Sequence, residues 1–177
     1  MGDSQLQMTA TQEEQADMVH KLLHKWQLWA HLPHDTDWSL KSYKSISSIE
    51  SVEEIIALYD SLSDQVIKNC MLFLMLDGVN PTWEDPQNAK GGCFSYKISN
   101  NCVPDVWKKL SYTLVGESII GSKYNNNITG ITISPKKNFC IMKIWMSNCN
   151  NQDPTTINYF NGIDSRGCLF KKFAPEY

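Results

Sequence analysis

The chain has 177 residues, 42% of them hydrophobic, and a formal net charge of −3 at pH 7. This length suits one domain, and the apolar content is high enough for a hydrophobic core, which excludes a disordered chain. The acidic balance argues against a protein held on nucleic acid by a general basic field, and the longest apolar run, residues 70–76, is too short to span a bilayer.

Residues 1–17 form a polar segment without the basic and apolar regions of a signal peptide, so we expect a flexible tail followed by a single domain over residues 18–177. Six cysteines form no C-x-x-C pair, which predicts reduced thiols in an intracellular protein. The four histidines have no cysteine or carboxylate at ligand spacing, so we expect neither a metal nor another cofactor.

Charge is unevenly distributed along the chain. Residues 1–120 hold 9 lysines against 16 acidic residues, a net charge of −7. Residues 121–177 hold 6 lysines and 1 arginine against 3 acidic residues, a net charge of +4. Any site for an anion is therefore expected in the last third of the chain.

The first predicted elements are two strands and a helix. Residues 24–31 alternate as a strand, and after a turn-rich loop that ends at Trp38, residues 39–49 alternate again. Ser51 then begins a helix, because Glu54 stands three residues later and completes a capping box. Apolar residues at helical spacing predict a buried stripe on this helix: Val52, Ile55, Ile56, Tyr59 and Leu62.

The remaining elements alternate in type. A buried strand over 70–76 leads through a loop of residues 78–92 to a strand over 92–98. Pro104 suits the first turn of a helix that runs to Val115 and ends at Gly116. Its expected inward face holds Val106, Trp107, Leu110 and Leu114. Residues 128–134 and 139–146 predict a hairpin, Asp153-Pro154 a short helix, and residues 168–173 a last strand. Hairpin-like links favour an α+β antiparallel sheet with helices on one face.

Six tryptophans are many for this length, and they fall into groups. Large aromatic side chains usually fill cores, and three of the six lie within periodic apolar patterns: Trp26, Trp29 and Trp107. Trp145 ends a strand and suits either the core or its rim. Trp38 and Trp83 differ, because each lies in a loop between polar residues with no apolar stripe to bury it. For this pair, packing and ligand contact are both open.

Two loop tryptophans beside an acid favour a flat, cationic ligand. Indoles can sandwich a planar ring, and a positive ring gains about 1–2 kcal/mol per face when water is excluded. Glu84, directly after Trp83, can accept two parallel N–H bonds from the edge of such a ring. 7-Methylguanine has these properties, since N1–H and N2–H₂ lie on one edge and methylation at N7 supplies the charge.

Several segments occur in the order and spacing of a known family: "HKWQLW", Trp38, "SVEEIIALY", "FLMLDGVNPTWEDPQNAKGG", "LVGES" and "TGITISPKKNFCIMKIW". Over roughly residues 20–146 the chain resembles the eukaryotic translation initiation factor 4E family, the messenger-RNA cap-binding proteins. The Trp-Glu-Asp loop with its trailing Gly-Gly is the most specific part. The resemblance implies a curved antiparallel sheet, helices on its convex face, and a concave slot for the cap.

The resemblance assigns roles on the concave side. Trp38 and Trp83 match the two stacking indoles, Glu84 matches the acid that pairs with guanine N1 and N2, and its backbone N–H should donate to O6. Trp145 matches the indole that touches the N7 methyl group.

For the cap phosphates, Lys136 stands where the family has an arginine. The family's second basic ligand falls on Ile141, so we expect Lys143, on the same strand face, to substitute for it. Lys137 is a further candidate, and Arg166, Lys171 or Lys172 could serve in a shortened C-terminal region. Without the resemblance, Lys136, Lys137 and Lys143 would be interpreted as ordinary solvent-facing lysines of a hairpin, with no ligand to bind.

The resemblance also predicts a partner surface on the convex face, made of His20, Leu22, Val52, Ile56, Lys108, Tyr112 and Gly116. Ile56 replaces a helical tryptophan of the family, and Lys108 and Tyr112 replace two leucines. Lys21 stands at the proline of the family's His-Pro-Leu anchor. A lysine in an apolar groove opposes an apolar peptide, so binding of the Tyr-x-x-x-x-Leu segment of the scaffold factor 4G, or of its competitor repressors, is left open.

Three functions remain. The first is a monomeric, non-enzymatic module that binds capped messenger RNA in the cytoplasm and recruits it for translation initiation. The lysine- and asparagine-rich composition resembles the copies of such proteins that large DNA viruses carry. If the chain is viral, the cytoplasm would be that of the host cell. The second is a repressor or decoy that occupies caps without engaging the scaffold factor. The third is a cap-processing enzyme, but no Nudix, P-loop or deaminase motif appears, and a lone Glu84 suits recognition better than base catalysis.

Overall fold

The structure is a computed structural model of the chain, and it describes residues 18–160 and 162–173. The predicted tail, residues 1–17, lies outside them. Over the described residues, strands form one antiparallel sheet in the order β2-β1-β3-β5-β6-β4-β7. The strands are β1 (Lys21–His31), β2 (Tyr43–Ser51), β3 (Met71–Leu76), β4 (Gly92–Ser99), β5 (Ile128–Pro135), β6 (Phe139–Met146) and β7 (Leu169–Lys172).

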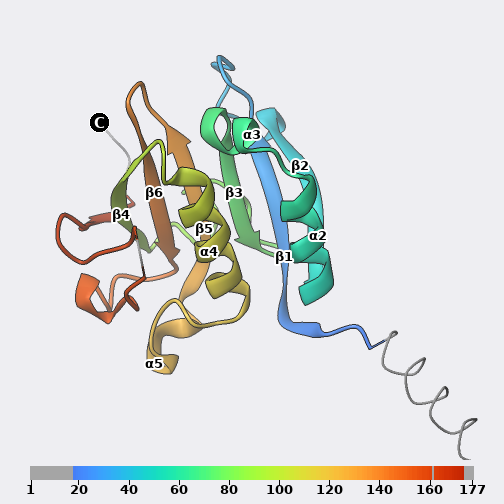
Figure 1. Ribbon diagram of the computed structural model, residues 1–177. Helices are drawn as coiled ribbons and strands as arrows, with labels where there is room; N and C mark the ends of the chain where they lie inside the picture. The colour runs from blue at the N-terminus through green and yellow to red at the C-terminus, as the bar shows by residue number, and fades with distance from the viewer. Residues whose placement is uncertain (1–17, 161, 174–177) are drawn as a thin grey trace, which may run out of the picture.

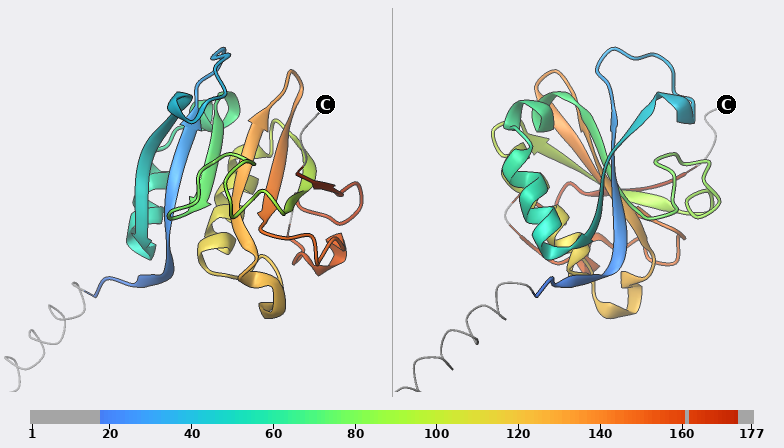
Figure 2. Two further views of the ribbon diagram at one scale, coloured as in Figure 1. Left: turned by 180° about the vertical axis from the view of Figure 1, so that it is seen from behind. Right: turned by 90° about the vertical axis from the view of Figure 1, so that its right-hand side faces the viewer.

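Helices cover one face of this curved sheet, as Figure 1 shows. The helical elements are α2 (Val52–Ser61), α3 (Asp64–Asn69), α4 (Val103–Val115), α5 (Ser122–Asn125) and the 3₁₀ turns η1 (Leu40–Ser42) and η2 (Pro154–Thr156). The other face carries the long loop between β3 and β4, which crosses the sheet in the rear view of Figure 2. The expected α+β fold, with helices on the convex face, is confirmed.

Strand alternation divides the apolar side chains between the two faces. The main core lies between the sheet and the helices, and its fully buried members include Leu28, Leu74, Ile131 and Trp107. A second cluster lies on the concave face and is made of Phe73, Met75, Val79, Cys93 and Trp145, with Trp29, Tyr43 and Phe173 packed against it. We call this second set the concave cluster.

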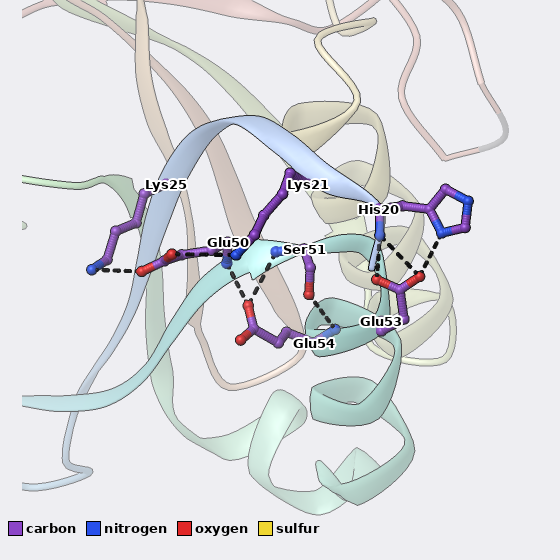
Figure 3. A network of polar contacts seen from close by, with 7 residues as sticks. All are labelled: His20, Lys21, Lys25, Glu50, Ser51, Glu53 and Glu54. Atoms are coloured by element: carbon purple, nitrogen blue, oxygen red, sulfur yellow. Dashed lines mark hydrogen bonds and ion pairs between the residues drawn. The ribbon is translucent and has the colours of Figure 1, made fainter. Parts of the chain in front are cut away.

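The start of α2 is fastened to the first strand by a polar network, drawn in Figure 3. Ser51 and Glu54 form the predicted capping box, with Ser51 Oγ accepting from the Glu54 N–H and Glu54 accepting from the Ser51 N–H. Glu53 accepts hydrogen bonds from the His20 backbone N–H and contacts the His20 imidazole at 2.6 Å. Lys25 pairs with Glu50 at 2.9 Å. Because the charged pairs are exposed, they add little to the free energy of folding. Their main effect is to set the direction of the chain where it enters β1.

Two expectations about α2 and β2 are wrong. The apolar stripe of α2 is only half buried, because Ile55 and Tyr59 face the core while Val52 and Ile56 remain exposed. Both exposed side chains line an open groove that α2 forms with Leu22 of β1 and with Tyr112 and Val115 of α4, so this part of the stripe faces the groove and not the core. The second strand begins at Tyr43 rather than at residue 39, because the Ser42 N–H and Oγ both donate to the Ser39 carbonyl and close a 3₁₀ turn.

Other elements agree with expectation more closely. Helix α4 and the β5–β6 hairpin are confirmed, and the predicted inward residues of α4 are all buried. The element after Asp153 is a 3₁₀ turn of three residues, capped by the Asp153 carboxylate on the Thr155 N–H. Helices α3 and α5 have no counterpart among the expected elements, since both are too short to show a clear periodicity.

Candidate functional site

The loop between β3 and β4 is held in one shape by two buried polar side chains. The Asp85 carboxylate accepts hydrogen bonds from the backbone N–H groups of Asn80 and Gln87, each at 2.9 Å. The Asn88 amide donates to the carbonyls of Asn80 and Thr82, and its oxygen accepts from Thr129 Oγ1 at 2.7 Å. Asp85 therefore fixes the loop, and Asn88 ties it to β5.

The double glycine that ends this loop is required by close packing. A Cβ at Gly91 would lie 1.7 Å from the Met146 carbonyl oxygen, and one at Gly92 would lie 2.6 Å from the Lys171 carbonyl oxygen. Any larger residue would push the loop away from β6 and β7. The glycines thus bring Trp83 and Glu84 back over the concave face.

A cavity of about 360 Å³ opens on the concave face beside this loop. It is lined by Trp83, Cys93, Lys143, Trp145, Lys171, Lys172 and Phe173. The volume lies in the range of small-molecule sites, and the mixture of aromatic rings and ammonium groups suits a planar ligand that carries negative charge elsewhere.

Trp145 forms part of the cavity floor. Its indole is buried, donates from Nε1 to Thr132 Oγ1 at 3.1 Å, and packs on Phe173 with ring centroids 4.7 Å apart. The sequence left open whether Trp145 lies in the core or at its rim. In the structure it does both, because it belongs to the concave cluster and also lines the cavity.

The positive charge of the cavity comes from strands on both sides of β4. Cys93 on β4 pairs with Trp145 on β6 and with Lys171 on β7, so these three residues share one row of the sheet. Lys143 lies two residues from Trp145 on β6 and therefore on the same face of the sheet. Burial raises the pKa of the Cys93 thiol, whereas the charges of Lys143 and Lys171 act in the opposite direction, which places both ammonium groups near it.

Trp38 lies at the other end of the concave face. Its indole is 56% exposed and stacks on the His31 imidazole, with centroids 4.1 Å apart and planes 3° apart. His31 meets the Tyr43 ring edge-on, and Tyr43 meets Phe73 of the concave cluster in the same way. Burial raises the pKa of the Tyr43 hydroxyl, and the charge of Glu84 raises it further, so the Glu84 carboxylate lies near Tyr43.

The expected site residues are therefore brought together in part. Trp83, Trp145 and Lys143 share one cavity, and Glu84 follows Trp83 directly in the loop beside that cavity. Trp38 does not line the cavity. The exposed Lys136 and Lys137 do not line it either, because they occupy the tip of the β5–β6 hairpin.

Some residues of the site were not expected to belong to it. His31 follows the alternation of β1, which puts it on the face opposite Trp26, Leu28 and Ala30, but nothing in the sequence showed that Trp38 would stack on it. Phe173 gave no signal, because its contact with Trp145 joins segments distant in the chain.

A second, apolar groove of about 220 Å³ lies on the convex side. It is lined by Leu22, Val52, Ile55, Ile56, Tyr112, Val115 and Gly116. Two of the seven residues predicted for the partner surface do not line it. His20 is paired with Glu53 instead, and Lys108 leans over the Tyr112 ring with its Nζ 5.8 Å from the centroid. The groove therefore stays apolar despite the nearby lysine.

Within residues 18–160 and 162–173, no group of three or more His, Cys, Asp or Glu side chains is arranged to hold a metal ion. In the same part of the chain, no helix has the length and apolar character needed to cross a membrane.

Comparison with known proteins identifies similar sequences and folds. The family model described as eukaryotic initiation factor 4E matches residues 21–160. Eukaryotic translation initiation factor 4E-2 of Schizosaccharomyces pombe is 31% identical over 145 residues, which cover 76% of this chain and 57% of that protein. Human eukaryotic translation initiation factor 4E is 26% identical over 143 residues, which cover 77% and 65%. The chain thus spans between 57% and 65% of the length of these two curated relatives.

Solved structures share the fold. Caenorhabditis elegans eIF4E-3, in complex with the 4E-binding protein Mextli and a cap analog, superposes with a TM-score of 0.68 at 22% identity, covering 75% of this chain and 76% of that one. Ascaris suum eIF4E-3 with an m7G cap superposes with a TM-score of 0.67 at 22% identity, covering 76% and 77%.

Proposed function

The chain belongs to the eukaryotic initiation factor 4E family, and from this premise we propose that its concave face binds the 7-methylguanosine cap of messenger RNA. The observation that carries the proposal is the rigid loop that presents Trp83 and Glu84 beside the cavity of Trp145, Lys143 and Lys171. Relatives of similar fold are described as complexes with a cap analog or an m7G cap.

Each part of the site then has one task. Trp83 stacks on one face of the methylated base and Trp38 covers the other, so that two indoles face a positive ring. Glu84 accepts hydrogen bonds from N1–H and N2–H₂, and its backbone N–H donates to O6. Trp145 borders the N7 methyl group. Since recognition accounts for every one of these groups, we infer a binding module and not an enzyme.

A fluorescence titration tests this proposal. Because Trp38 and Trp83 are 56% and 36% exposed, stacking of a base on them should quench the emission of the protein. Addition of 7-methyl-GTP is expected to give saturable quenching, and GTP, which lacks the positive ring, should bind more weakly by roughly tenfold or more. Equal affinity for the two nucleotides would contradict the proposal.

We assign the cap phosphates to the ammonium groups around the cavity, chiefly those of Lys143 and Lys171. Lys136 and Lys137, at the tip of the β5–β6 hairpin, are assigned to the phosphates of the cap that lie farther from the base. Lys143→Gln and Lys171→Gln are each expected to weaken binding of 7-methyl-GTP by about three- to tenfold, since each removes a charge-assisted contact. Binding of 7-methylguanosine, which has no phosphate, should change little. Isothermal titration calorimetry with both ligands measures the difference.

Lys44→Gln on the edge strand β2 provides the matched control, because Lys44 is exposed and does not line the cavity. If both cavity variants bound 7-methyl-GTP as tightly as the unchanged protein, the phosphates would have to lie elsewhere.

The convex groove is proposed to bind an apolar helical segment of a protein partner, of the kind named in relatives as 4E-binding proteins. Its apolar lining favours recruitment over a decoy, because Lys108, which lies near Tyr112, is not among the residues that line the groove. We propose that the protein acts in the cytoplasm, which would be that of the host cell if the chain is viral. We also propose that it acts as a monomer.

Ile56→Lys is expected to abolish binding of such a segment, since it places a charge among apolar side chains. A peptide carrying the Tyr-x-x-x-x-Leu segment, assayed by fluorescence anisotropy, measures this loss. Ile56 is 45% exposed, so the fold and the affinity for 7-methyl-GTP should remain unchanged. No binding of the peptide to the unchanged protein would instead support the decoy function.

A further inference from the structure

We propose that His31 is a positioning residue that holds the Trp38 indole as a preformed wall of the ligand site. In this arrangement one face of the indole lies on the imidazole, and the opposite face is left for the ligand. This inference rests on the proposed function and adds a residue to that same site.

The geometry of the contact supports a fixed stack. The two rings are nearly parallel, with planes 3° apart and centroids 4.1 Å apart. Trp38 is nevertheless 56% exposed, although one of its faces is covered. Since the imidazole covers one face of the indole, the exposed remainder offers a face on which a planar ligand can stack.

The imidazole itself is held on several sides. His31 is only 2% exposed, and its Nε2–H donates to the Asp37 carbonyl at 2.8 Å. Because a carbonyl only accepts, Nε2 carries the proton in this bond. The ring also meets the edge of Tyr43 at 5.2 Å. The Trp38 indole therefore rests on a ring that cannot easily rotate.

The loop around Trp38 is ordered by its own polar contacts. The Asp37 carboxylate accepts hydrogen bonds from the Ser39 N–H at 2.8 Å and from Ser39 Oγ at 2.9 Å. The same bonds hold the pKa of the Asp37 carboxyl below its ordinary value. The residues on both sides of Trp38 are thus fixed by hydrogen bonds, while the indole is fixed by His31.

The stack links Trp38 to the rest of the site through rings. Trp38 contacts His31, His31 contacts Tyr43, and Tyr43 contacts Phe73 of the concave cluster, which also contains Trp145. Glu84 lies close enough to Tyr43 for its charge to act on the hydroxyl. An indole placed before the ligand arrives loses less conformational entropy on binding, which strengthens affinity without any new contact to the ligand.

The test combines substitutions at His31 with loss of Trp38. His31→Ala is expected to weaken binding of 7-methyl-GTP by about three- to tenfold, the range for one lost aromatic pair. His31→Phe keeps a flat ring and should bind within about twofold of the unchanged protein. In a Trp38→Ala background, His31→Ala should have no further effect, because the indole that it positions is absent.

A ligand-free measurement keeps the inference separate from the proposed function. Acrylamide quenching of the Trp38 emission, taken as the difference from Trp38→Phe, is expected to rise in His31→Ala and to stay at the level of the unchanged protein in His31→Phe. Failure of the unchanged protein to bind 7-methyl-GTP would overturn the proposed function alone. Unchanged acrylamide quenching in His31→Ala, or an equal loss of affinity with and without Trp38, would overturn the positioning role.

Discussion

Replacing Trp83 with alanine is expected to reduce the affinity for 7-methyl-GTP by roughly 30- to 1,000-fold, the range found when a central aromatic contact is removed. The indole supplies one face of the ring sandwich and a wall of the cavity, so its loss removes the cation–π attraction and admits water to the base. Calorimetric titration measures the effect.

The fold should tolerate this change. Trp83 is 36% exposed, and the loop that carries it is held by Asp85 and Asn88 rather than by the indole. The melting temperature should therefore stay close to that of the unchanged protein. Tyr159→Ala is a matched control, because Tyr159 is 75% exposed and lies outside the cavity. Retention of affinity within about twofold in Trp83→Ala would show that the base does not stack there.

Replacing Glu84 with glutamine is the second change with a large expected effect. The glutamine keeps the size of the side chain but removes its charge and one of its two acceptors, so N1–H and N2–H₂ can no longer both be accepted. Hydrogen bonds to charged groups contribute about 1.5–3 kcal/mol, which predicts a loss of roughly 10- to 150-fold in affinity for 7-methyl-GTP.

The same variant should also lose selectivity for the purine edge. 7-Methylinosine triphosphate lacks the 2-amino group, so the unchanged protein is expected to prefer 7-methyl-GTP over it, and Glu84→Gln should reduce that preference. Competition titrations with both nucleotides provide the comparison, with Asp105→Asn on the exposed side of α4 as the control. An unaltered preference would mean that another group recognises the edge of the base.

Local sequence patterns predicted the parts of the fold that depend on neighbouring residues. The capping box joins Ser51 and Glu54, which stand three positions apart, and the inward face of α4 follows from the helical spacing of its apolar residues. Periodicity alone could not show that Val52 and Ile56 would remain exposed, because that depends on how α2 and α4 lie relative to each other, which leaves both side chains in an open groove.

The site divides in the same way. Trp83 and Glu84 stand out in the sequence because a tryptophan and an acid in a polar loop are unusual together. His31 and Phe173 join the site only because β1 and the segment after β7 meet on the same concave face, and these segments are far apart in the chain. Lys171 was one of three alternatives in the C-terminal region, and the pairing of β7 with β4 brings it to the cavity. Lys136 was the expected first phosphate ligand, yet it lies at the tip of the hairpin, outside the cavity that Lys143 and Lys171 line.

The most direct test of cap binding is a crystal structure with 7-methyl-GTP. We expect the methylated base between the indoles of Trp83 and Trp38, with its N1 and N2 atoms on the Glu84 carboxylate and its phosphates directed toward Lys143 and Lys171. A base bound elsewhere, or one bound in the cavity without contact to either Trp83 or Glu84, would contradict the proposed function.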